Sequence, residues 1–182
     1  MSSTATNGTD PIVFLDFDDV ICCNAPYGGE HVFSEPRPAD LWERLFAPEP
    51  VKTLLAVVER HNPKFVITTS WLRHMSRDTC DKILRYSGLS AVADRMHETW
   101  DAWPSRSMSR REAIERWLKD HHRGEPYVIL DDELSGIGLP KSSHAAAGRV
   151  ILCQQDVGLH EGHLEAIAAA LEKPAAARSW MP

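Results

Sequence analysis

The amino-acid sequence predicts an α/β fold, a three-layer, Rossmann-like parallel sheet with helices on both faces. Short runs of β-branched and aliphatic residues alternate along the chain with segments of helical periodicity, as expected for successive strand–helix units. The runs are continuously apolar, which is typical of parallel strands covered on both faces. The length of 182 residues suits one domain with a sizeable core.

Five short apolar runs are the expected strands of this sheet. The second run follows a break at Asn62-Pro63, and the third is the weakest of the five. The expected strands are Ile12–Leu15, Phe65–Thr68, Val92–Met96, Tyr127–Leu130 and Val150–Leu152.

Helical spacing of apolar residues predicts four helices between and after these strands. Gly88 follows the second helix and Pro174 the last, which are typical stop signals. At the start of the third helix, Ser109 with Glu112 three residues on fits a capping box. The expected helices are Val51–Arg60, Ser76–Tyr86, Ser109–His121 and Glu161–Leu171.

The elements divide the chain into one domain with two loose ends. Residues 1–10 are rich in Ser, Thr, Asn and Gly and lack both a basic start and an apolar stretch, so we interpret them as a disordered leader rather than a secretory signal. Residues 11–173 form the single expected domain, in which residues 21–50 are a flap or small cap insertion that includes a short helix near 39–46. Residues 174–182 are a loose tail.

Composition excludes several classes of protein. No apolar run approaches the length of a membrane span, so we expect no membrane insertion. A net charge of -6 argues against a protein that coats nucleic acid. The four cysteines include no C-x-x-C pair, which argues against a zinc site or a disulfide framework and fits reduced thiols in a cytoplasm.

Polar residues follow three of the expected strands at the point where each strand ends. The segment 16–20, with the sequence DFDDV, follows the first strand, Thr69-Ser70-Trp71 follows the second, and Asp131-Asp132-Glu133 follows the fourth. In a parallel sheet the ligand site lies beyond the carboxyl ends of the strands. We therefore expect two acidic clusters and a pair of hydroxyl groups to meet at one edge of the sheet.

Clustered carboxylates repel one another and lose hydration when they are brought together. A hard cation with oxygen ligands relieves this repulsion, and Mg²⁺ suits a few carboxylates together with water and phosphate. We expect Asp16 and Asp132 as the carboxylate ligands, Asp131 beside them or one shell further out, and the backbone carbonyl of Asp18 as a further ligand.

The same residues can carry phosphoryl transfer. Asp16 can attack phosphorus to form an aspartyl-phosphate, because the metal cancels charge between the two anions. Asp18 can protonate the leaving oxygen and then activate water. Thr69 and Ser70 offer donors to the phosphate oxygens, and Arg110 is the candidate cation that completes the charge balance.

These motifs resemble the four motifs of the haloacid-dehalogenase-like (HAD) superfamily. The segment 16–20 is similar to its first motif, D-x-D-x-[TV], and Thr69 to the second. The segment 110–114 is similar to the third motif, and Asp131-Asp132 to the fourth. The resemblance runs from about Pro11 to Leu171 and implies the HAD fold, Mg²⁺ and a hydrolase of the phosphatase type.

A narrower resemblance points to a small bacterial subgroup related to HAD domains of RNA-repair proteins. It rests on Thr69-Ser70-Trp71, the pattern A-I-x-x-W-L at 113–118, I-L-D-D-E at 129–133 and V-G-L at 157–159. This likeness implies a fold and a reaction rather than a substrate.

Two assignments stay open at this point. The third-motif position holds Arg rather than the commoner Lys, and Arg111 could serve in place of Arg110. Arg binds phosphate as a planar fork and keeps its charge. The second motif is also ambiguous, because Thr68, Thr69 and Ser70 are consecutive. Resemblance favours Thr69.

The leading hypothesis is a phosphomonoester phosphatase whose site is nearly capless and open. The alternatives are a nucleotide or nucleic-acid-end phosphatase and a catalytically degenerate module that binds phosphate or a partner. Trp71, Arg73 and Arg37 are candidates for the substrate rim. Within 106–123, six Arg and Lys residues outnumber three Asp and Glu residues, which favours an anionic substrate body. The sequence leaves the oligomeric state open.

Overall fold

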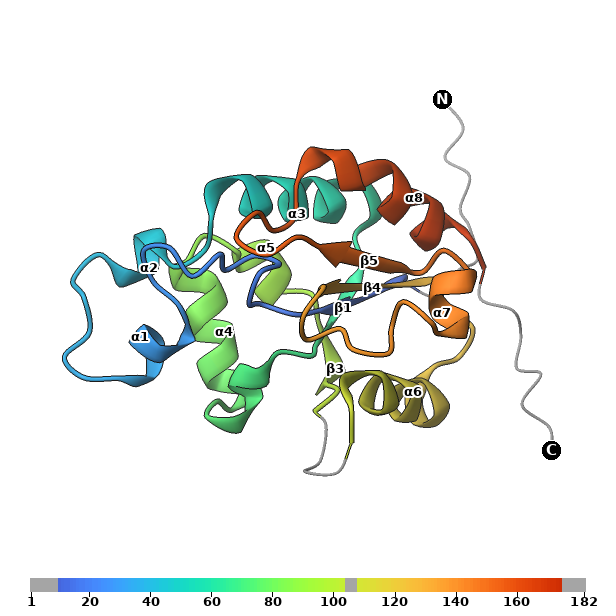
Figure 1. The fold of residues 1–182 in the computed structure, drawn as a ribbon, viewed down its shortest axis with the longest axis horizontal. Helices are drawn as coiled ribbons and strands as arrows, with labels where there is room; N and C mark the ends of the chain where they lie inside the picture. The colour runs from blue at the N-terminus through green and yellow to red at the C-terminus, as the bar shows by residue number, and fades with distance from the viewer. Residues whose placement is uncertain (1–9, 104–107, 175–182) are drawn as a thin grey trace.

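The computed structural model describes residues 10–103 and 108–174. Its centre is a five-stranded, all-parallel sheet in the order β3-β2-β1-β4-β5 (Figure 1). The predicted three-layer α/β fold is therefore confirmed. The predicted leader, apart from Asp10, and the predicted tail, apart from Pro174, lie outside the described residues.

Four of the five strands lie where continuous apolar runs predicted them. The strands are β1 (Ile12–Leu15), β2 (Lys64–Ile67), β3 (Met96–Asp101), β4 (Tyr127–Asp132) and β5 (Val150–Cys153). Strands β1, β2 and β4 are buried along most of their length, whereas the edge strand β5 is partly exposed at three of its four residues.

The third strand was predicted in the wrong place. Instead of a strand at 92–96, a short helix, α5 (Ser90–Ala93), buries Val92 and Ala93 against the core, and the strand β3 begins only at Met96. Because β3 is an edge strand with partly exposed residues after Met96, it contains no continuous apolar run to reveal it.

Helices cover both faces of the sheet and divide the core into two clusters. In Figure 1, α3 and α8 lie over one face and α6 and α7 lie on the opposite side. Val13 and Leu15 point into the cluster that also holds residues of α3, α4, α5 and α8, whereas Phe14 packs on Ile114 and Trp117 of α6. The helices are α3 (Pro48–His61), α4 (Arg77–Tyr86), α6 (Arg110–His121), α7 (Ser143–Ala146) and α8 (Leu164–Glu172), the last preceded by the 3-10 turn η2 (Glu161–His163).

The flap, residues 21–50, connects β1 to α3 and holds two short helices at one end of the molecule (Figure 1). These are α1 (Gly29–Phe33) and α2 (Leu41–Arg44), and the second lies inside the helix expected near 39–46. A 3-10 turn, η1 (Ser70–Arg73), follows β2. No helix in the described part of the chain is long and apolar enough to cross a membrane.

Candidate active site

The register of the sheet brings three chemically important residues to one level. Leu15, the last residue of β1, pairs with Ile67 of β2 and with Leu130 of β4. Backbone hydrogen bonds continue this register by one residue beyond β1. The residues that follow at the carboxyl edge are Asp16, Thr68 and Asp131.

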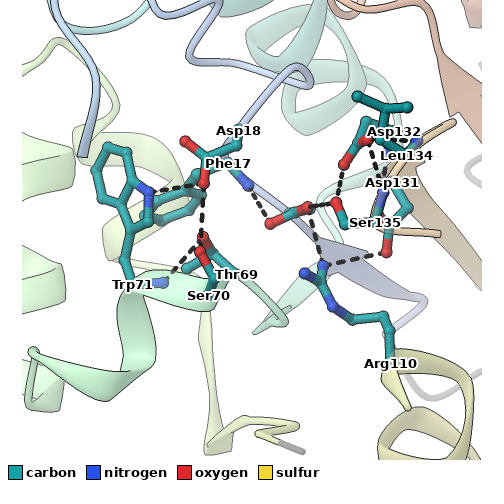
Figure 2. A network of polar contacts seen from close by, with 11 residues as sticks. Phe17, Asp18, Thr69, Ser70, Trp71, Arg110, Asp131, Asp132, Leu134 and Ser135 are labelled. Carbon is teal, nitrogen blue, oxygen red and sulfur yellow. Dashed lines mark hydrogen bonds and ion pairs between the residues drawn. The ribbon is translucent and has the colours of Figure 1, made fainter. Parts of the chain in front are cut away.

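The predicted carboxylates form a buried cluster. Asp16, Asp131 and Asp132 each offer a carboxylate oxygen, and these oxygens lie within 4.8 Å of one another. Backbone N–H groups of Leu134 and Ser135 donate to Asp132 Oδ1 at 2.7 and 2.8 Å, which fixes that carboxylate. The Ser135 hydroxyl donates to Asp132 and, at 3.3 Å, to Asp16 Oδ2 (Figure 2).

Ser135 was not among the residues that the sequence singled out. The sequence feature that could have pointed to Ser135 is its position three residues after Asp132. In the structure, the turn that leaves β4 folds back over the carboxylates there. A serine in an exposed turn is common, so sequence alone gave no reason to select it.

Arg110 reaches the cluster from the first turn of α6. Its Nη1 lies 2.9 Å from Asp16 Oδ2 and 3.1 Å from Asp131 Oδ2. The predicted capping box begins this helix: Ser109 N–H donates to Glu112 Oε2 at 2.7 Å, and Glu112 N–H donates to Ser109 Oγ at 3.3 Å. The cap therefore fixes the backbone next to the buried guanidinium.

The structure places Arg110, and not Arg111, at the carboxylates. Arg111 Nε lies 2.7 Å from Glu115 Oε1, and both of these side chains are partly exposed. Successive residues of a helix point in directions about 100° apart, so only one of two adjacent arginines can face the end of the sheet.

The cluster carries an excess of buried negative charge. Burial raises the pKa of Asp16, while the guanidinium of Arg110 opposes the rise. Burial and the neighbouring Asp16 raise the pKa of Asp131 well above its ordinary value. Three buried carboxylates with a single guanidinium in contact among the described residues fit a divalent cation, which would supply the missing positive charge.

Asp18 lies on the other side of Asp16 and is only partly buried. Burial and the nearby Asp16 raise the pKa of Asp18 to about 6. Trp71 Nε1 donates to Asp18 Oδ2 at 2.9 Å, and the Ser70 hydroxyl donates to the same oxygen at 3.4 Å (Figure 2). A carboxyl group in this setting suits proton transfer near neutral pH.

The three consecutive hydroxyl residues have different surroundings. Thr68 is fully buried, and its Oγ1 has no partner among the described residues. Thr69 is the N-cap of η1, where its Oγ1 accepts the Trp71 N–H at 3.4 Å. Ser70 is exposed and contacts Asp18. Of the three hydroxyl groups, that of Ser70 is therefore the exposed one beside Asp18.

An open groove of about 440 Å³ runs from Asp18 between η1 and the flap. Two of the predicted rim residues, Trp71 and Arg73, line it, and the Arg73 guanidinium lies 5.5 Å from the centre of the Trp103 ring. The other groove residues are Asn24, Gly29, Glu30 and Phe33 from the flap, and Ser70 and His74 from η1 and its C-cap.

The third predicted rim residue, Arg37, is not among the residues that line the groove. Its Nε donates to Val32 O at 2.9 Å, and its Nη2 lies 3.2 Å from Glu35 Oε1, so it holds the flap together instead. Arg106, which belongs to the predicted basic stretch, lies outside the described residues.

One family model matches most of the chain. The model describes the HAD domain in Swiss Army Knife RNA repair proteins, and it matches residues 12–164. The chain belongs to this family. The superfamily recognised from the four motifs is thereby confirmed, and membership places this HAD domain among hydrolases of the phosphatase type. The comparisons with curated proteins and with solved structures gave no match.

Proposed function

We propose that this HAD domain is a magnesium-dependent phosphomonoester hydrolase that works through an aspartyl-phosphate on Asp16. The position of Asp16 carries the proposal. On one side it meets the carboxylates of Asp131 and Asp132, and on the other side Asp18 follows it at the head of the open groove. A phosphate placed at this junction contacts a nucleophile, a cation site and a proton donor together.

The residues divide the reaction into two steps at phosphorus. In the first, an oxygen of Asp16 forms a bond to phosphorus, the ester P–O bond breaks, and Asp18 gives its proton to the leaving oxygen. In the second, Asp18 takes a proton from water as that water forms a bond to phosphorus, the bond between phosphorus and the Asp16 oxygen breaks, and inorganic phosphate is released with the Asp16 carboxylate restored. Phe17 N–H donates to Asp16 Oδ1 at 2.8 Å and orients the nucleophile throughout.

Charge balance assigns the remaining residues. Asp16, Asp131 and Asp132, with the backbone carbonyl of Asp18, would hold Mg²⁺. When bound, this ion neutralises the repulsion between the phosphate and the carboxylates. Arg110, which already contacts Asp16 and Asp131, would bind phosphate oxygens beside them, and the hydroxyl of Ser70 together with the Thr69 region would supply further donors.

The covalent mechanism is tested with an aryl phosphate and two nearly isosteric variants. Asp16→Asn removes the nucleophile, so hydrolysis is lost while circular dichroism stays as in the wild type. Asp18→Asn removes the proton donor, so turnover falls by roughly 10²–10⁴-fold. Hydrolysis at the wild-type rate by Asp16→Asn would falsify the proposal.

The metal site is tested by titration of Mg²⁺ after chelation and dialysis. Hydrolysis disappears with chelator and returns with Mg²⁺, and Asp132→Asn raises the Mg²⁺ concentration needed for half of the maximal rate. Mg²⁺ also raises the thermal midpoint of the wild type more than that of Asp132→Asn, because a bound ion stabilises the folded state. Full activity in excess chelator contradicts the proposed site.

A nucleotide or nucleic-acid end is the second candidate substrate. The groove favours it, because Phe33 and His74 offer ring faces for a base and the exposed Arg73 adds positive charge that can meet a backbone phosphate. The description of the family, which names RNA repair proteins, supports the same substrate class.

Removal of Arg73 separates this candidate from a small-molecule phosphatase. We expect Arg73→Ala to raise KM for a phosphate-ended oligonucleotide more than KM for an aryl phosphate. Arg60→Ala is the matched control, since Arg60 pairs with Glu172 away from the groove and its loss changes net charge equally. Oligonucleotide hydrolysis also weakens steeply with salt. Equal KM changes for the two substrates rule out the nucleic-acid end.

A further inference from the structure

Trp71 contacts the side chain of the proposed proton donor directly. Its indole nitrogen Nε1 lies 2.9 Å from Asp18 Oδ2, although the two residues are 53 positions apart in the chain (Figure 2). The indole N–H is the one polar group of a tryptophan side chain, and it can donate but not accept. It holds the carboxylate without exchanging a proton with it.

The indole ring is fixed by the residues around it. Trp71 is 4% exposed. Its ring meets Phe17 edge-on at 5.2 Å between centroids, Phe33 edge-on at 6.1 Å, and Phe46 in a stacked arrangement at 6.4 Å. Because aromatic neighbours from the segment after β1 and from the flap confine the ring, the direction of its N–H is set in advance.

The two donors that reach Asp18 leave one of its oxygens for chemistry. Among the described residues, both Trp71 and Ser70 donate to Oδ2. Asp18 also lines the groove in which the leaving group would lie. With Oδ2 held by two donors, Oδ1 is the oxygen left to meet the leaving group. Without these donors, the carboxylate would rotate freely at this half-exposed position.

Gly29 leaves the space that this contact needs. It is the first residue of α1 in the flap, and a β-carbon there would lie 2.6 Å from Nε1 of Trp71 and 2.7 Å from Cε2. Such a separation is far inside van der Waals contact, so any larger residue at position 29 displaces the indole from Asp18. The flap thus touches the proton donor through Trp71.

We propose that Trp71 is a positioning residue that orients Asp18 for proton transfer to the leaving group, and that Gly29 admits the indole to this position. The proposal rests on the proposed function of Asp18. It gives the flap a role beyond lining the groove, because the first turn of α1 packs on the group that aims the acid.

A matched pair of aryl phosphates tests the role of Trp71. Phenyl phosphate and 4-nitrophenyl phosphate are similar in shape, but phenol is the poorer leaving group and depends more on protonation. The parameter to compare is kcat/KM, which reports the steps up to the phosphoenzyme. Trp71→Phe keeps a ring and loses the N–H, so kcat/KM falls roughly 10–100-fold for phenyl phosphate and less than about threefold for 4-nitrophenyl phosphate.

Gly29→Ala tests the same contact without changing Trp71. Gly29→Ala should also lower kcat/KM more for phenyl phosphate than for 4-nitrophenyl phosphate. Trp117→Phe is the control, since Trp117 Nε1 also donates from the core, to Thr99 O at 3.0 Å, on the other face of the sheet. This variant should lower stability without changing the ratio of kcat/KM values.

A spectroscopic readout checks the contact apart from catalysis. In a ¹H–¹⁵N spectrum of the full chain, the indole signal absent from Trp71→Phe belongs to Trp71. We expect Asp18→Ala and Gly29→Ala to shift this signal and to leave that of Trp117 in place. An unmoved Trp71 signal, or equal losses on the two esters in an active protein, overturns the role of Trp71 alone. If the wild type hydrolyses neither ester, the proposed function fails first and the role of Trp71 fails with it.

Discussion

Arg110 holds together a cluster of charges that would otherwise repel. Arg110 is 9% exposed, and its guanidinium contacts two carboxylates, those of Asp16 directly after β1 and of Asp131 in β4. Buried charges of this kind are tolerated only when their partners are present, and loss of one partner costs more than loss of a surface pair. Arg110 therefore contributes to stability and, in our proposal, to phosphate binding.

Replacing each arginine in turn distinguishes the contribution of Arg110 from that of its neighbour Arg111. Arg110→Ala should lower the free energy of unfolding by about 3 kcal/mol, because two buried carboxylates lose their cation. It should also weaken the binding of inorganic phosphate. Arg111→Ala removes only a partly exposed pair with Glu115 and should cost less than about 1 kcal/mol. Denaturant titration and calorimetry measure both effects, and equal losses in the two variants contradict the assignment.

The first turn of α6 connects local helix chemistry to the site. The capping box of Ser109 and Glu112 orders the backbone on either side of Arg110. Ile114 and Trp117 then pack the same helix against Phe14 of β1. The cap and the apolar face together aim the guanidinium at the carboxyl edge of the sheet.

Two serine N-caps allow this connection to be tested. Ser109→Ala and Ser76→Ala each remove a side-chain cap, at α6 and at α4 respectively. Each should lower the free energy of unfolding by about 1 kcal/mol. Since only α6 carries Arg110, Ser109→Ala should also reduce kcat/KM for an aryl phosphate, and Ser76→Ala should leave it unchanged. Equal activity in the two variants would show that the cap does not affect the site.

The molecule as a whole contains a polar network on the α6 side of the sheet, away from the groove. A hydrogen bond of 2.8 Å joins Tyr127 Oη of β4 to His144 Nδ1 of α7, and His144 Nε2 lies 3.5 Å from Glu115 Oε1 of α6. Burial lowers the pKa of His144, and the positive charges of Arg111 and Arg149 act in the same direction, while Glu115 opposes them. The folded state therefore favours the neutral imidazole.

This network predicts how one histidine affects stability at acid pH. The folded pKa of His144 lies below its unfolded value of about 6.5, so the unfolded state binds more protons as pH falls through that range. The stabilisation from neutral His144 is present above the unfolded pKa and is lost on acidification. Between pH 7.5 and pH 5.5, the thermal midpoint of His144→Asn should therefore fall less than the thermal midpoint of the wild type. An identical pH dependence contradicts this assignment.

The comparison of the wild type with His144→Asn also controls for the other histidines that titrate. Burial lowers the pKa of His61, His97 and His163, whose shifts are common to both proteins. Their effects therefore cancel in the difference between the wild type and His144→Asn.

The sequence by itself determined the sheet and most of the chemistry at its edge. Continuous apolar runs marked four strands, and burial on both faces explains the runs in the three inner strands β1, β2 and β4, where polar residues have no place. Acidic segments directly after two of those runs predicted that Asp16, Asp131 and Asp132 meet, since parallel strands end at a common edge. The capping box at Ser109 was equally local and was confirmed.

Only the tertiary structure decided which side chains touch across elements. It placed Arg110 rather than Arg111 at the carboxylates, brought Ser135 to Asp132, and put Trp71 against Asp18. It also moved the third strand to the exposed edge at 96–101, where no apolar run marks it. Periodicity along a chain reports how each element is buried, whereas these contacts depend on the packing of side chains from distant segments, which no local pattern encodes.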